Sequence, residues 1–187
     1  MIRLFVAIPI PEELRRRMTM LCTGVRGAHW AHEDNMHVTL SFIGEVPDDR
    51  VADITAELDR VRSAPFALTL AGAGHFETGR RVRALWIGIE PEPALLALKE
   101  RVDAALARAG HQPERRRFLP HVTIARMKGL SPGAVAGWLG ANTLFRAVPF
   151  DVDRFVLYRS HLGQGGAHYQ PLHEVALDAA GGGVGSG

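Results

Sequence analysis

Hydrophobic runs separated by proline and glycine predict the first half of this chain in the order strand, helix, strand, helix, strand. An apolar run over residues 4–8 that ends at a proline predicts a buried strand. Apolar residues at helical spacing predict a helix that opens at Pro11, and a strand follows over residues 36–43. A second amphipathic helix is expected from Asp48, and a further strand begins after Pro65.

The second half of the chain repeats this order of elements. The stretch 71–83, which is rich in glycine and arginine, is expected to be the loop between the halves. The elements expected after it are a strand over 84–89, a helix over 93–109 capped by Gly110, a strand from 121 to about 126, a helix from Ser131, a strand from Phe150 and a final strand over 167–177. Trp86 lies within an apolar run, which indicates a core side chain.

The third element of each half carries nearly the same tetrapeptide, HVTL from His37 and HVTI from His121. Because the side chains of a strand alternate between its faces, His37 and Thr39 share one face. In the same way, His121 and Thr123 share one face of the later strand. Each strand therefore has a polar face that can line a cleft and an apolar face that can pack in a core.

The two tetrapeptides belong to an internal duplication. They lie 84 positions apart (121 − 37), and two further pairs of segments keep that offset: PFAL from Pro65 with PFDV from Pro149, and the dipeptide VA at Val51 with VA at Val135. Three pairs at a single offset are typical of a repeated unit. We therefore expect an α+β fold of two pseudo-symmetric lobes around a central cleft, each lobe an antiparallel-type sheet with outer helices.

The composition is that of an ordinary globular protein. The chain has 187 residues, of which 47% are hydrophobic and 22% are charged. We expect one bilobal domain over residues 1–178, with duplicated halves over about 2–71 and 84–157. The glycine-rich tail over 179–187 is expected to be disordered. A net charge of +2 permits an anionic partner but does not require one.

The single cysteine and the N-terminal sequence bear on the compartment. Cys22 alone excludes an internal disulfide and a multi-cysteine metal site, and it fits a reducing compartment. The apolar N-terminal run is too short to span a bilayer and has no cleavage site of a signal peptide. These features predict a cytoplasmic protein without a membrane partner. Because no oligomer interface is evident, we expect a monomer.

Three kinds of chemistry could use two His-x-Thr strands. A catalytic zinc site would need a third protein ligand, which the motifs do not supply. A Thr nucleophile would be present twice, which a single acyl transfer does not need. General acid–base catalysis explains the symmetry, because a neutral and a protonated imidazole can act on opposite sides of one phosphorus atom. The hydroxyls of Thr39 and Thr123 can then donate to the non-bridging oxygens, and no metal or other cofactor is required.

The segments around the motifs resemble the two-histidine (2H) phosphoesterase superfamily. Within it they are similar to the bacterial and archaeal RNA 2′,3′-cyclic phosphodiesterases, once described as 2′-5′ RNA ligases. The resemblance covers about residues 2–172, and four segments carry it: RLFVAI from Arg3, NMHVTLSFIG from Asn35, FLPHVTIAR from Phe118 and LYRS from Leu157.

This resemblance implies hydrolysis of a 2′,3′-cyclic phosphate, on an RNA end or a nucleotide, to a 2′-phosphate end. It implies that His37 donates a proton to the leaving 3′ oxygen and that His121 accepts one from water, although the near-identical motifs do not by themselves assign these roles. It also implies that Arg126 lies near the phosphate. Strict alternation places Arg126 on the face opposite His121, and a twist or bulge in the strand would reconcile the two expectations.

Aromatic and basic residues outside the motifs add further candidates. Phe76, in the expected loop, can stack on a base of the substrate or pack in the core. Arg115, Arg116 and Arg117 precede the second motif and can steer RNA phosphates or form a solvated loop. The alternatives in function are the same fold acting on 2′-5′ linkages, by hydrolysis or ligation, or on ADP-ribose cyclic phosphate, and a nucleotide-binding module without turnover.

Overall fold

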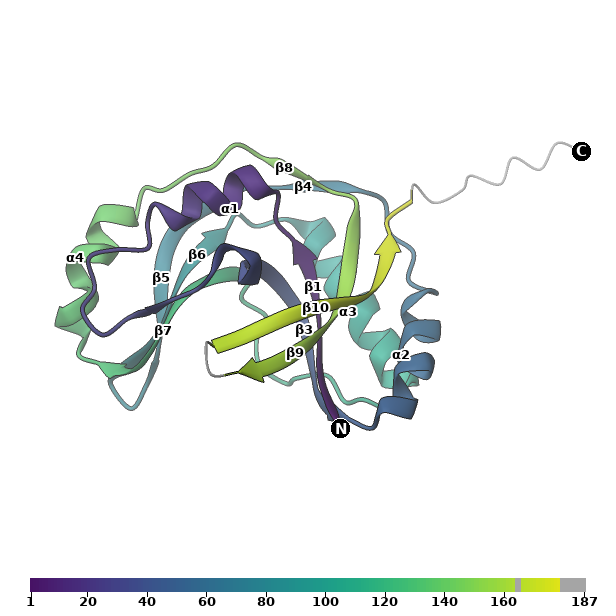
Figure 1. Cartoon of the computed structure of the whole chain (residues 1–187). Coiled ribbons are helices and arrows are strands. Elements are labelled where there is room, and N and C mark those ends of the chain that lie inside the picture. The colour runs from purple at the N-terminus through teal and green to yellow at the C-terminus, as the bar shows by residue number, and fades with distance from the viewer. Residues whose placement is uncertain (164–165, 179–187) are drawn as a thin grey trace, which may run out of the picture.

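Two four-stranded sheets form the framework of the computed structural model, which describes residues 1–163 and 166–178 (Figure 1). The expected tail over 179–187 lies outside the described residues. The first sheet has the order β10 (Gly166–Ala176), β9 (Arg154–Gly163), β1 (Ile2–Pro9), β3 (His37–Val46). The second sheet has the order β2 (His29–Trp30), β7 (His121–Leu130), β6 (Arg81–Ile89), β5 (Leu70–Thr78). Every pair of neighbouring strands is antiparallel, so the expected α+β class is confirmed.

The helices lie outside the two sheets. They are α1 (Glu12–Thr19), α2 (Val51–Leu58), α3 (Pro93–Arg108) and α4 (Pro132–Asn142), with short 3-10 turns η1 (Glu33–Asn35) and η2 (Asp48–Arg50). Helices α2 and α3 pack against each other beside the first sheet, whereas α4 lies at the second sheet (Figure 1). The helix expected from Asp48 begins three residues later, at Val51, because the acidic residues form η2. Among the helices of the described residues, none has the length and apolar character needed to traverse a bilayer.

A short strand pair joins the two halves at their pseudo-twofold axis. Strand β4 (Phe66–Leu68) pairs with β8 (Phe150–Val152), and Ala67 lies opposite Asp151. These two residues are 84 positions apart (151 − 67), which is the offset of the duplication. Each half therefore pairs with the equivalent segment of the other half.

The apolar faces of the strands form the core. Leu4, Val6 and Ile8 of β1 belong to this core, as do Leu85 and Ile87 of β6, whereas Phe5 and Ala7 are buried on the other face of β1. In the motif strands, the residues between the histidine and the threonine are Val38 and Val122, both of which have no exposed surface. The apolar face that alternation assigns to each motif strand is thus the face that packs.

The stretch 71–83 is not a loop, which corrects the expectation from sequence. It forms most of β5, a tight turn and the start of β6, with Thr78 paired to Arg81. Gly79 and Arg80 both have positive φ, as a two-residue type I′ hairpin turn requires. Gly74 within β5 allows a close approach rather than a break, because a Cβ there would lie 2.2 Å from ring carbons of Trp86.

Trp86 is also not a core residue. It is partly exposed, and its ring covers Gly74 on the face of the second sheet that carries His121. The apolar neighbours of Trp86 in sequence point to the opposite face, which is the core side.

Adding a methyl group at Gly74 is expected to destabilise the protein. The Cβ of Gly74→Ala would overlap the Trp86 ring, so the free energy of unfolding should fall by about 1–3 kcal/mol in urea titrations. Gly137→Ala is the matched control, because that helical glycine has no heavy atom within 4 Å of an added Cβ. This control should stabilise by roughly 0.5–1 kcal/mol. Equal stability of both variants and the wild type would contradict the packing of Trp86 over Gly74.

Candidate active site

The two motif strands bring His37 and His121 together. Strands β3 and β7 contact each other, and the two imidazoles are close enough that a charge on His121 lowers the pKa of His37. Both rings are half-buried, so neither belongs to a separate core. Thr39 and Thr123 are half-buried as well and lie two residues further along each strand. We call the faces of the two sheets that carry these histidines the site face.

Each motif strand contains one extra residue just after its threonine. In β3, Ala7 lies opposite Thr39 and Val6 opposite Ser41, so Leu40 has no partner on β1. Leu40 and Ser41 are consequently both buried, and alternation resumes with Phe42 exposed. This bulge turns Phe42 back to the site face, where its ring lies 6.2 Å from the ring of Phe5.

The same bulge occurs at the equivalent position of β7 and decides the placement of Arg126. Trp86 lies opposite Thr123 and Leu85 opposite Ala125, so Ile124 is the extra residue. Ile124 and Ala125 are both buried and Arg126 is exposed. Strict alternation therefore gave the wrong face for Arg126, and the bulge returns it to the face of His121 and Thr123.

Arg126 acts electrostatically on both imidazoles. Its positive charge lowers the pKa of His37 and that of His121. An anion placed between the rings would therefore meet a fixed cation as well as two potential hydrogen-bond donors.

Backbone groups orient the two rings in the same way. The His121 Nδ1 lies 2.7 Å from the carbonyl oxygen of Leu119, and the backbone of Asn35 acts on the His37 ring by raising its pKa. In each case the partner is two residues upstream. For His121 this contact leaves Nε2 as the nitrogen available for chemistry.

Aromatic rings flank each imidazole. The ring centroid of Phe5 lies 4.9 Å from that of His37, and Tyr169 stands edge-on to His37 at 5.2 Å. Phe76 stands edge-on to His121 at 4.8 Å, and the centroid of Trp86 lies 6.0 Å away. Phe76 thus lies on a strand beside the second histidine rather than in a loop.

Burial has a clear effect on the protonation of the pair. It lowers the pKa of His37 to about 4, with smaller lowering by Arg126 and His121, while the Asn35 backbone opposes the shift. Burial also lowers the pKa of His121, and the contact with Leu119 opposes it. In the free protein, His37 is therefore neutral at pH 7. Negative charge from a bound ligand would shift both values upward.

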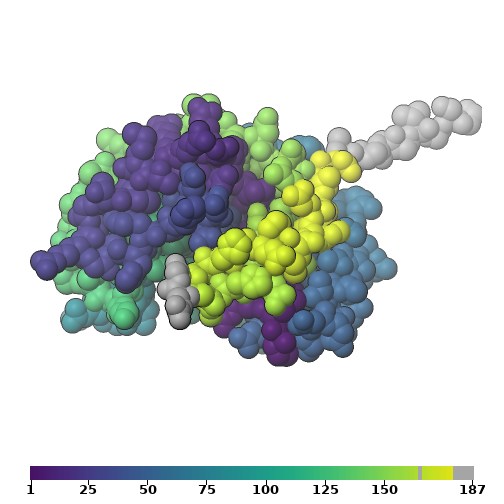
Figure 2. Space-filling model, viewed as in Figure 1, coloured from purple at the N-terminus to yellow at the C-terminus, as the bar shows by residue number. Residues whose placement is uncertain are grey.

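The turn that precedes His37 is fixed by distant parts of the chain. Asn35 Nδ2 donates to the carbonyl oxygen of Ala167 on β10 at 2.7 Å, and Arg15 Nη1 of α1 lies 2.9 Å from Asp34 Oδ1. In Figure 2 the C-terminal strands, in yellow, lie against this dark blue segment. The backbone just before His37 is thus held by contacts with β10 and with α1. The local sequence predicts neither contact.

Sequence reasoning missed most of the aromatic rings beside the histidines, among them Phe42, Trp86 and Tyr169. Strict alternation assigns Phe42 to the packing face, but its side chain is 52% exposed. The apolar run around Trp86 predicts a core residue, although Gly74, which lies opposite it on β5, leaves the space for its ring. For Tyr169 the sequence holds no local signal, because the contact joins β10 to β1 and β3.

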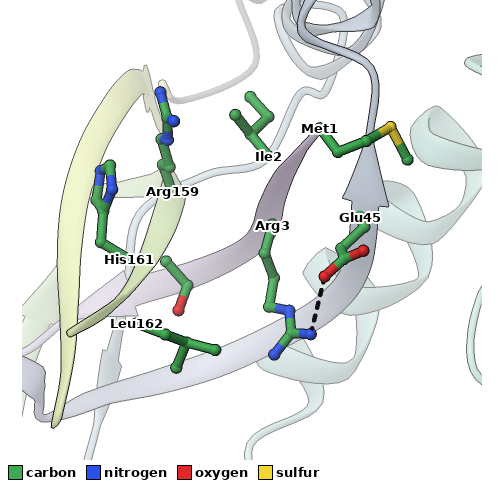
Figure 3. A pocket seen from close by; sticks show the side chains of 8 residues that line it. Met1, Ile2, Arg3, Glu45, Arg159, His161 and Leu162 are labelled. Atoms are coloured by element: carbon green, nitrogen blue, oxygen red, sulfur yellow. Dashed lines mark hydrogen bonds and ion pairs between the residues drawn. The ribbon is translucent and has the colours of Figure 1, made fainter. Parts of the chain in front are cut away.

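The pocket drawn in Figure 3 is a separate feature. It has a volume of about 270 Å³ and lies between β1, β3 and β9, with Arg3 paired to Glu45 at 3.2 Å (Figure 3). Neither motif histidine lines it. Within residues 1–163 and 166–178, no group of three or more His, Cys, Asp or Glu side chains is placed to hold a metal ion.

Known proteins are similar to this chain in both sequence and fold. The RNA 2′,3′-cyclic phosphodiesterase of Thermotoga maritima is 34% identical over 184 residues, which cover 94% of this chain and 96% of that relative. A crystal structure of a phosphoesterase superimposes with a TM-score of 0.79 at 29% identity and covers 95% of this chain and 99% of its own. Escherichia coli LigT complexed with 3′-AMP superimposes with a TM-score of 0.75 at 30% identity and covers 94% of this chain and 98% of its own.

A family model supports the same assignment. The model of the 2′-5′ RNA ligase superfamily matches residues 7–164, which include both motif strands and both bulges. Together with the duplicated fold, this match shows that the chain belongs to the 2′-5′ RNA ligase superfamily.

Proposed function

We propose that the protein hydrolyses 2′,3′-cyclic phosphates on RNA ends or nucleotides to 2′-phosphates, with His37 and His121 as an acid–base pair. The observation that carries this proposal is the meeting of two half-buried imidazoles, one from each half, beside the charge of Arg126. The names of the relatives, RNA 2′,3′-cyclic phosphodiesterase, support the choice of ester.

The reaction needs one proton to be taken and one to be given. Following the family resemblance, His121 accepts a proton from water as the water oxygen forms a bond to phosphorus. The bond from phosphorus to the 3′ oxygen breaks, and His37 gives a proton to that oxygen. The phosphate stays on the 2′ oxygen, so the product is a 2′-phosphate with a free 3′ hydroxyl.

The remaining site-face groups would stabilise charge and hold the nucleoside. The hydroxyls of Thr39 and Thr123 can donate to non-bridging oxygens, where negative charge gathers in the transition state. The cation of Arg126 would act on the same oxygens. Phe76 and the exposed Phe42 offer rings on which a base can stack.

The lowered pKa values fit this mechanism once the substrate is considered. A pKa of about 4 leaves His37 neutral in the free protein at pH 7, whereas a proton donor must be protonated. A phosphodiester anion beside the ring favours the imidazolium form and raises that pKa. We therefore propose that the pair with bound substrate holds a single proton on His37, whose positive charge disfavours a second proton on His121 and leaves His121 Nε2 free to accept one from water.

Removing either imidazole is expected to abolish most turnover. His37→Ala and His121→Ala should each lower kcat on a nucleoside 2′,3′-cyclic phosphate by about 10²–10⁴-fold, because each removes one proton transfer. Phosphorus NMR of the product reports both turnover and the position of the phosphate. Treatment with a chelator should leave the wild-type rate unchanged, and Cys22→Ala serves as a control away from the motifs.

Several results would contradict this proposal. Activity that survives either His→Ala substitution would eliminate the acid–base pair. A 3′-phosphate product would reverse the assignment of the leaving oxygen. Turnover of 2′-5′ linkages or of ADP-ribose cyclic phosphate, with none of 2′,3′-cyclic phosphates, would leave the site correct but the ester wrong.

The pH dependence of the reaction is expected to shift when the charge of Arg126 is removed. This cation lowers the pKa of both imidazoles, so Arg126→Gln should raise both values. Both limbs of the profile of kcat/KM against pH should then move to higher pH, and kcat/KM itself should fall because a phosphate contact is lost. Arg126→Lys keeps the charge and should keep the wild-type limbs. A profile that is unchanged in Arg126→Gln would show that this charge does not act on the pair.

A further inference from the structure

Basic side chains continue outward from Arg126 along the site face of the second sheet. Lys128 is exposed, lies two residues beyond Arg126 on β7, and is separated from it by the buried Met127. On the neighbouring strand β6, Arg81 and Arg83 are exposed and flank Val82, which is fully buried on the core side. We call Arg81, Arg83 and Lys128 the basic band.

Contacts across β6 and β7 hold the basic band together. Arg83 Nη1 donates to the carbonyl oxygen of Lys128 at 2.6 Å. Gly129, with φ of +118°, leaves the space that the arginines use: a Cβ there would lie 3.3 Å from Arg81 Cβ and 3.4 Å from Arg83 Cζ. Both arginines thus lie against the same glycine, so three positive charges are gathered at the edge where β6 and β7 run out from the site.

No carboxylate neutralises the basic band within the described residues. The ion pairs there involve other arginines, for example Arg3 with Glu45 and Arg50 with Asp53, and none includes a member of the band. The nearest acid along β5, Glu77, lies opposite the core-facing Val82 and contacts His75 at 2.8 Å. Because these positive charges have no carboxylate partner within the protein, the basic band favours binding of an anionic molecule.

We propose that the basic band binds backbone phosphates of the RNA strand upstream of the cyclic phosphate, so that the preferred substrate is an oligonucleotide. This inference rests on the proposed function. A cyclic phosphate occupies the 3′ end, so the rest of the strand must leave the site in its 5′ direction. The band continues from Arg126, the cation at the site, and successive residues on one face of a strand are about 6.6 Å apart, two steps of about 3.3 Å. An extended single strand can therefore meet Arg126 first and the band next.

Such contacts are independent of base sequence and sensitive to salt. Lysine and arginine that neutralise phosphates release counterions, and the logarithm of the binding constant falls with the logarithm of salt concentration by about 0.7 per contact on single strands. Three contacts therefore contribute about 2 to that slope (3 × 0.7).

The test compares substrates of different length on one triple variant. We expect Arg81→Gln/Arg83→Gln/Lys128→Gln to hydrolyse a nucleoside 2′,3′-cyclic phosphate with wild-type kcat/KM. On an oligoribonucleotide of six or more residues with the same 3′ end, kcat/KM should fall at least tenfold, through KM rather than kcat. The salt slope of binding to a fluorescent oligoribonucleotide ending in a 3′-phosphate should also become shallower by about 2.

The chain offers a control of equal charge change. Arg60 and Arg62, which follow α2, and Arg101 on α3 are exposed, and these helices lie outside the first sheet, so Arg60→Gln/Arg62→Gln/Arg101→Gln should leave the oligonucleotide results unchanged. The proposal is overturned if the band variant keeps the preference for length, or if this control loses it to the same extent. It is also overturned if wild-type protein shows no preference for the longer substrate.

A binding measurement tests this inference separately from the proposed function, because it does not require turnover. If wild-type protein hydrolyses no cyclic phosphate, the proposed function fails, and anisotropy of the fluorescent oligoribonucleotide still tests the band. Weaker binding by the band variant alone then supports a phosphate-binding surface, and equal binding by all three proteins rejects it. Circular dichroism of both triple variants confirms that they are folded.

Discussion

The extra residue just after the threonine of each motif strand determines what the site can contain. A regular strand would place the residue five positions after the histidine in the core, but the bulges at Leu40 and Ile124 return Phe42 and Arg126 to the site face. Each bulge also leaves two consecutive residues buried, which fixes the register of the strand against its neighbour. The site is therefore set by backbone geometry as much as by the identity of its side chains.

Burial of the imidazoles is the second constraint. Aromatic rings such as Phe5 and Phe76 remove water from around the histidines, which disfavours the charged form, and the cation of Arg126 adds to this effect. Single backbone contacts, at Asn35 and Leu119, oppose it. In the free site, protonation of the two imidazoles is therefore unfavourable, whereas binding of an anion is favourable.

The sequence predicted much of this architecture because the relevant signals are local or repeated. Alternation within the motif strands identified which face packs and which face is polar, and the offset of 84 (121 − 37) implied two equivalent lobes. The strand pair β4–β8, centred on residues one offset apart, is the physical form of that repeat. The family resemblance then suggested Arg126, which alternation alone would have excluded.

Other features depend on contacts that sequence patterns do not record. Gly74 looks like a loop residue until the Trp86 ring is seen against it, and Trp86 looks like a core residue until its pairing opposite Thr123 places it on the site face. The tie between Asn35 and Ala167 joins segments far apart in the chain. These errors share a cause, since each concerns a side chain whose neighbour comes from another strand.

The equivalent positions Phe42 and Arg126 give the duplicated site a direction. With the same residue at both positions, the two ends of the site would differ only in the aromatic rings that flank each imidazole, and a ligand would have less to tell them apart. An aromatic ring at one end and a cation at the other increase that difference. Because these two side chains fix the orientation in which a ligand binds, each imidazole faces a different part of that ligand. Two nearly identical histidine motifs can then have different chemical roles.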